Sequence, residues 1–110
     1  MDGLSYTIDD IKRLCKSDTL VWKHHALKRL QQRKILQSEV EECICNGEII
    51  ETYTEDTPFP SCLVFGITLN GRYLHTVCSI GDGNLYIITA YQPDTDKWES
   101  DYKTRKRVQK

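Results

Sequence analysis

The spacing of apolar residues changes near the middle of the chain, at Gly47. Before this residue the apolar positions recur every three or four residues, as on one face of a helix, and after it they alternate, as in half-buried strands. Ser38 with Glu41 forms the sequence pattern of a capping box, and Asn46-Gly47 is a strong helix stop. The pattern therefore predicts three helices, over about 5–16, 21–34 and 38–46.

The second half of the chain predicts strands separated by turn residues. The expected strands cover 48–53, 61–69, 72–80 and 85–92. Pro93-Asp94 then stops the last strand and starts a final helix that carries Trp98 and Tyr102. The chain is thus expected to be a single α+β domain over residues 1–110. In it, N-terminal helices pack on a four-stranded antiparallel sheet, with a C-terminal helix.

The Asn70-Gly71 pair predicts a two-residue hairpin turn, which fixes a register. With this turn and the next hairpin paired in the same way, His75 lies between Gly66 and Ala90 on the face turned away from the helices. A histidine between two small side chains is either the floor of a cleft or a half-exposed strand residue without a role.

Charge is segregated along the chain, although the formal net charge is only −1, from 15 basic and 16 acidic residues. Residues 22–35 are basic without an acid, whereas 39–56 are acidic without a base. On the predicted second helix His25, Arg29 and Arg33 are spaced by four and form one row. Arginine binds phosphate with a planar fork and histidine transfers protons near neutral pH, so the row indicates either phosphodiester chemistry on RNA or a solvated basic helix face.

The sequence lacks the marks of a membrane or secreted protein. No apolar run approaches 18 residues, and the first residues do not have the pattern of a signal peptide. Five cysteines, an odd number without a Cys-x-x-Cys pair, argue against a disulfide framework and favour a reducing cytoplasm. We expect them to act as small buried hydrophobic residues. A zinc site would require long-range pairing with His24, His25 or His75, and no metal or other cofactor is expected.

Several spaced motifs together resemble a known family. They are, in order, residues 23–35 (KHHALKRLQQRKI), 47–51 (GEIIE) with Tyr53, 60–63 (PSCL), 71–75 (GRYLH), and 88–91 (ITAY) with Pro93 and Trp98. This pattern is similar to a family of small prokaryotic proteins labelled as a domain of unknown function. That family is grouped with the RelE-like toxins and, more widely, with barnase, colicin nuclease and EndoU-type ribonucleases. The resemblance covers about residues 21–102.

The resemblance implies a RelE-like toxin fold whose sheet receives RNA, and an endoribonuclease that works without metal. In such enzymes a ribose 2′-hydroxyl attacks the neighbouring phosphate and leaves a cyclic phosphate. Related proteins pair with an antitoxin that has a zinc-binding part and a DNA-binding helix-turn-helix. This chain has neither feature, so it resembles the toxin of a type II pair, which acts on RNA such as messenger RNA on the ribosome.

Mapped onto these residues, the reaction requires a base, an acid and cations for the phosphorane charge. His25 and His75 are the expected acid and base, and Arg29 the cation at the reacting phosphate. Arg33 and Arg72 are expected to bind phosphate, and Tyr91 to stack a base or donate a proton. The alternative that Tyr91 is a structural tyrosine of the core is at least equally expected.

A binding module that holds RNA or a protein without cleaving is the alternative, because Arg72 is the only basic residue between Thr52 and Gln92. A metal-dependent hydrolase that uses histidines and cysteines is a third possibility.

Overall fold

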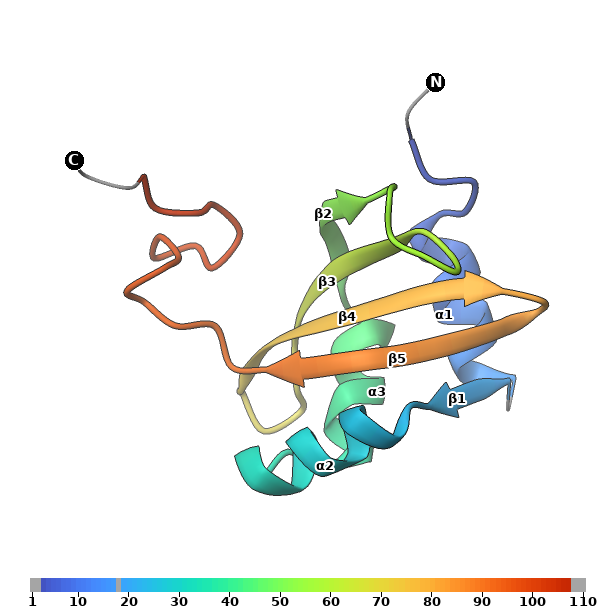
Figure 1. Cartoon of the computed structure of the whole chain (residues 1–110). Coiled ribbons are helices and arrows are strands. Elements are labelled where there is room, and N and C mark those ends of the chain that lie inside the picture. The colour runs from blue at the N-terminus through green and yellow to red at the C-terminus, as the bar shows by residue number, and fades with distance from the viewer. Residues whose placement is uncertain (1–2, 18, 108–110) are drawn as a thin grey trace.

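The computed structural model describes residues 3–17 and 19–107. Its elements are, in order, α1 (Ile8–Lys16), β1 (Leu20–Trp22), α2 (His24–Arg33), α3 (Gln37–Cys45), β2 (Glu48–Tyr53), β3 (Ser61–Ile67), β4 (Tyr73–Gly81) and β5 (Asn84–Tyr91). The strands form one five-stranded sheet in the order β1-β5-β4-β3-β2 (Figure 1). β1 runs parallel to β5 and the other neighbours are antiparallel. The predicted sheet of four antiparallel strands is therefore wrong, and the sheet is mixed.

The extra strand β1 comes from residues that were expected to open the second helix. Leu20, Val21 and Trp22 pair with residues 85–87 of β5, and the Lys23 N–H donates to the Ile87 carbonyl at 3.3 Å. β-branched and aromatic residues suit a strand when a partner edge is available. The helix α2 consequently begins at His24.

The expected C-terminal helix is also wrong. Residues 92–107 form turns and a single antiparallel bridge between Trp98 and Arg105. Trp98 is only 2 % exposed, and its ring meets the His75 ring edge to face at 4.5 Å. This segment, which we call the C-terminal strap (residues 94–107), thus contacts the face of the sheet opposite the helices. The predicted RelE-like toxin fold, with N-terminal helices on a four-stranded antiparallel sheet and a C-terminal helix, therefore does not describe this chain.

The helix ends follow from local capping. Thr7 caps α1 and shares a capping box with Asp10. The third helix begins at Gln37 rather than Ser38, and the acid at its start is Glu39, whose carboxylate accepts the Leu36 N–H at 2.9 Å. None of the helices in the described residues is long and apolar enough to cross a membrane.

The core lies between the helices and one face of the sheet. Buried residues of α1 and α3, among them Ile11 and Val40, pack against β3, β4 and β5. Cys15, Cys43, Cys62 and Cys78 are buried and free, which confirms the small-hydrophobe prediction for four cysteines, whereas Cys45 is exposed. The helix α2 lies along β5, at the side of the sheet where β1 forms the edge (Figure 1).

A close approach between α3 and β3 sets the hairpin register. A Cβ on Gly66 would lie 2.0 Å from the Cys43 carbonyl oxygen, so the strand must present this glycine to the helix. Gly66 consequently pairs with Leu74 and Phe65 with His75, and residues 68–72 form a longer loop instead of a two-residue turn. The predicted register was one residue off, which reverses the face of every β3 side chain.

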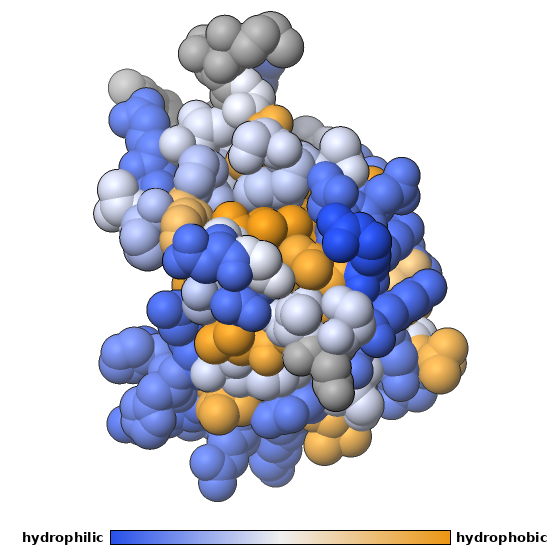
Figure 2. Space-filling view, turned by 90° about the vertical axis from the view of Figure 1, so that its right-hand side faces the viewer, coloured by the Kyte–Doolittle hydropathy of each residue, from blue (hydrophilic) through white to orange (hydrophobic). Residues whose placement is uncertain are grey.

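Apolar surface remains at one end of the molecule. Figure 2 shows the side that is on the right in Figure 1, where β4 turns into β5, with hydrophobic surface at its centre among mostly hydrophilic side chains. Isolated exposed apolar side chains are ordinary on a folded protein, so this view alone does not mark an interface.

We expect Gly66→Ala to lower the free energy of unfolding by about 1–3 kcal/mol, because the added methyl group meets the α3 backbone. Urea denaturation followed by circular dichroism measures this change. The matched control is Gly3→Ala, where the new Cβ has open space. Equal stability of the two variants would show that α3 can move away from β3 without cost.

Candidate functional site

The basic row forms on α2 as predicted. His25, Arg29 and Arg33 are all exposed on this helix, four residues apart. The helix ends at Lys34, which adopts the left-handed conformation with φ of 56°. The row follows β5, since His25 lies near the middle of the strand, by Tyr86 and Ile88, and Arg33 lies at its end.

A hollow of about 480 Å³ lies at the His25 end of the row. It is mostly apolar and is lined by residues of α2, the loop before β3, β4 and β5. These residues are Lys23, His25, Asp56, Thr57, Pro58, Phe59, Ser79, Tyr86 and Ile88. The rings of Phe59 and Tyr86 stack at 5.8 Å, and the Lys23 ammonium lies 4.9 Å from the Tyr86 ring centre. Aromatic faces beside cations are suited to stacking a nucleobase.

Arg33, at the other end of the row, is held in place by uncharged groups. Its Nη1 donates to the Ala90 carbonyl at 2.8 Å and to the Thr89 hydroxyl at 3.1 Å. Its guanidinium lies 5.9 Å from the centre of the Tyr91 ring. Because these acceptors are neutral, the positive charge of Arg33 is fixed in position without being cancelled.

His75 is not at an open site. It is fully buried. It pairs with Phe65 instead of Gly66 because of the β3–β4 register. It pairs with Tyr91 instead of Ala90 because β5 has one extra residue, Ile88, at a bulge. Its Nε2–H donates to the Tyr102 carbonyl at 2.7 Å, and burial lowers the pKa of the imidazole. The prediction that it faces away from the helices is correct, but the predicted cleft floor is wrong. His75 instead supports the C-terminal strap.

Tyr91 lies beside His75 and is half-buried. Its hydroxyl is 3.4 Å from His75 Nδ1, and burial raises its pKa. Since His75 Nε2 carries the proton that Tyr102 accepts, Nδ1 is the acceptor for the Tyr91 hydroxyl. One edge of the Tyr91 ring belongs to this buried contact, while its face is under Arg33.

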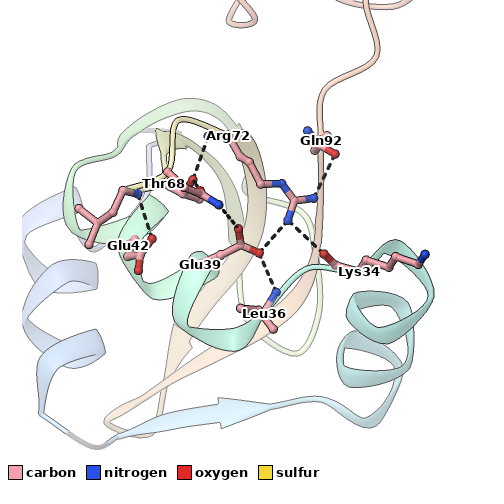
Figure 3. Close-up of polar contacts among 9 residues, drawn as sticks. Lys34, Leu36, Glu39, Glu42, Thr68, Arg72 and Gln92 are labelled. Atoms are coloured by element: carbon pink, nitrogen blue, oxygen red, sulfur yellow. Dashed lines mark hydrogen bonds and ion pairs between the residues drawn. The ribbon is translucent and has the colours of Figure 1, made fainter.

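Arg72 is a structural residue. Its Nη1 donates to Glu39 at 2.7 Å and to the Lys34 carbonyl at 3.0 Å, and its Nη2 donates to Gln92 at 3.1 Å (Figure 3). The Glu39 side chain is 8 % exposed and that of Arg72 is 23 % exposed. With its donors turned inward to these acceptors, Arg72 joins the α2–α3 turn to β4 and the end of β5, and is poorly placed to bind phosphate.

Two further cations are paired with acids of β2. Arg105 donates to both carboxylate oxygens of Glu51, at 2.7 and 3.0 Å, and Lys103 contacts Glu48 at 3.2 Å. The bidentate guanidinium contact is the main reason that the pKa of Glu51 lies below its usual value. The acidic segment of residues 39–56 therefore partly serves to hold the strap.

Sequence reasoning missed Lys23, Phe59 and Tyr86 of this first hollow. It also missed Lys97 and Trp98, which line a second hollow, of about 350 Å³, at the Arg33 end of the row. Of these residues only Lys23 is close to the row in sequence, so only Lys23 could have been predicted from local sequence. The sheet and the strap bring the others near α2. Within the described residues, no three His, Cys, Asp or Glu side chains are grouped so that they would hold a metal ion.

These features define a small α+β protein with a basic helix row between two hollows. Residues 22–92 match the model of the family described as "Domain of unknown function (DUF4258)", and the chain belongs to this family. No curated protein and no solved structure matches the chain. The family assignment carries no activity with it.

We expect Glu39→Gln to lower the free energy of unfolding near pH 7 by about 1–2 kcal/mol, because Arg72 loses its charged partner and keeps only the Lys34 carbonyl and Gln92. Burial alone raises the pKa of Glu39, but the Leu36 N–H and the Arg72 guanidinium outweigh it and the pKa lies below its ordinary 4.5. A lowered carboxyl pKa stabilises the fold above the unfolded value, and this contribution is lost as the pH falls through the folded value.

The stability difference between wild type and Glu39→Gln should therefore shrink as the pH falls below about 4.5. Urea denaturation from pH 7 to 3 measures it. Glu55→Gln, which removes an exposed carboxylate with no ion pair among the described residues, is the control. A difference that does not change with pH would contradict the ion pair.

Proposed function

We propose that this protein binds single-stranded RNA along α2 and β5 and cleaves it without a metal ion. The observation that carries the proposal is the row of His25, Arg29 and Arg33, which leads from a hollow with aromatic rings to a fixed and uncancelled guanidinium. A nucleic acid strand needs positive charge for its backbone and flat apolar surfaces for its bases. This surface offers both on neighbouring elements.

Cleavage proceeds by attack of a ribose 2′-hydroxyl on the adjacent phosphate. His25 is the proton-transfer group, because it is exposed at the rim of the hollow. Arg29, one turn further along the helix, stabilises the phosphorane charge. Asp56 lines the same hollow and is the second proton-transfer group that the reaction requires, complementing His25 as acid or base. His75 and Arg72 have no part in this scheme, since both are engaged inside the fold.

The wider biological role extends the same proposal. The sequence motifs resemble those of a family grouped with the RelE-like ribonuclease toxins, and this resemblance supports the proposed activity although the fold predicted from it is wrong. The protein would then be the toxin of a type II pair, inhibited by an antitoxin in the cytoplasm. Five free cysteines are consistent with a reducing compartment.

A second candidate is an RNA-binding protein of the same surface that does not cleave. The enclosure of His75 favours it, because the two histidines that were expected to act together do not share an open site. Binding and cleavage must consequently be measured separately.

Arg29→Ala is expected to weaken binding of a labelled single-stranded RNA. It should also make the slope of log binding constant against log salt concentration shallower, by the amount that about one phosphate contact contributes. Lys28→Ala is the matched control, because Lys28 is an exposed cation on the same helix but about 100° away from the row. Fluorescence anisotropy at several salt concentrations gives both values. Equal losses in the two variants would indicate a diffuse charge effect and contradict an ordered row.

His25→Ala is expected to abolish cleavage and leave RNA binding within about twofold, because removing the proton-transfer group affects the reaction and not the strand contacts. The wild type should cleave in the presence of a chelator and leave a cyclic phosphate. His24→Ala serves as the control. Intact RNA that binds to the wild type would establish the non-cleaving alternative, and full cleavage by His25→Ala would refute the role of His25.

A further inference from the structure

A second hollow, of about 350 Å³, lies where α2, the end of β5 and the C-terminal strap meet. It is lined by Arg33, Tyr91, Asp94, Lys97, Trp98 and Arg105. Three of these residues are basic and one is acidic. Four of them come from the strap, which lies beyond the residues 22–92 that match the family model.

Two guanidiniums in this hollow are held rigidly. Arg105 is fixed by Glu51 and lies 4.6 Å from the centre of the Trp98 ring. Arg33 uses Nη1 for Ala90 and Thr89, so its Nε and Nη2 have no acceptor among the described residues. These two groups are the fork with which arginine binds the oxygens of a phosphate.

The remaining two charged groups differ in how they are engaged. Lys97 is exposed and forms no ion pair among the described residues. Asp94 opposes an anion, but its Oδ1 already accepts the Asp96 N–H at 2.8 Å. Arg33 and Lys97 therefore contribute positive charge that no carboxylate pairs with, beside the partly neutralised Arg105.

We propose that this hollow is a phosphate-binding subsite in which the strap completes the surface begun by Arg33. The ligand is a phosphate group of the RNA strand, bound by the free fork of Arg33 and by the Lys97 ammonium. This inference rests on the proposed RNA-binding function, since it places a second backbone contact at the far end of the row from His25. It also gives the strap a role in binding that the matched family region alone would lack.

The test compares Lys97→Glu with Lys16→Glu, an equal charge reversal on α1, away from the hollow. We expect Lys97→Glu to weaken binding of a single-stranded RNA oligonucleotide by at least about tenfold and to lower its salt dependence by about one contact, and Lys16→Glu to change binding by less than about twofold. Lys97→Gln should have an intermediate effect. Circular dichroism verifies that each variant is folded.

A direct readout comes from the Nε–H signals of Arg33 and Arg105 in nuclear magnetic resonance spectra. RNA should shift the Arg33 signal in the wild type and shift it less in Lys97→Glu. If RNA binds but Lys97→Glu behaves as Lys16→Glu does and the Arg33 signal stays in place, the subsite is refuted while the proposed function stands.

Inorganic phosphate is the second probe, and it separates the two proposals. If RNA does not bind but inorganic phosphate shifts the Arg33 signal and Lys97→Glu abolishes that shift, the subsite is supported as a site for a small free phosphate and the proposed function fails. If RNA does not bind and inorganic phosphate does not shift the signal, both proposals are refuted.

Discussion

The ion pair between Arg72 and Glu39 is the contact on which the arrangement of the surface depends. Glu39 caps the start of α3 through the Leu36 N–H, and Arg72 reaches the Lys34 carbonyl at the end of α2. This pair thus fixes the turn between two helices against the hairpin of β3 and β4, and Gln92 adds the end of β5. A partly buried guanidinium needs acceptors within the fold, and here three of the five N–H donors of Arg72 have one. This junction holds the C-terminal end of α2, while the buried Ala26 and Leu30 pack the helix itself along β5.

Local patterns predicted the helical row and most strands, and non-local contacts account for the errors. The spacing of His25, Arg29 and Arg33 requires only a helix, so the sequence was sufficient for it. The hairpin register was not predictable from Asn70-Gly71, because it depends on how closely Gly66 approaches the backbone of α3. That approach involves residues more than twenty positions apart. A turn signal of two residues does not outweigh it.

Non-local contacts also explain the strand β1, the C-terminal strap and the structural role of His75. Residues 20–22 become a strand only because the edge of β5 is free to pair with them. Trp98 had a helical context in the sequence, yet the fold buries it against His75, whose Nε2 binds the Tyr102 carbonyl. The sequence predicts a catalytic role for His75 because it does not reveal which groups bond to the two ring nitrogens. Once Tyr102 and Tyr91 satisfy both ring nitrogens, the imidazole is a structural group.

The cations of this surface differ in whether a carboxylate of the fold pairs with them, and this separates the structural cations from those available to a ligand. Arg72 and Arg105 each face a carboxylate at 2.7 Å, so much of their electrostatic attraction is already used within the fold. Arg33 is as well positioned as either, but its acceptors are a carbonyl and a hydroxyl, which hold it without neutralising it. An anion that approaches Arg33 meets a group that needs neither to be ordered nor to be released from a competing carboxylate. A cation that is held in position but not paired with a carboxylate is preorganised to bind a phosphate. Arg33 meets this condition, which favours the β5 side of the molecule as the binding surface.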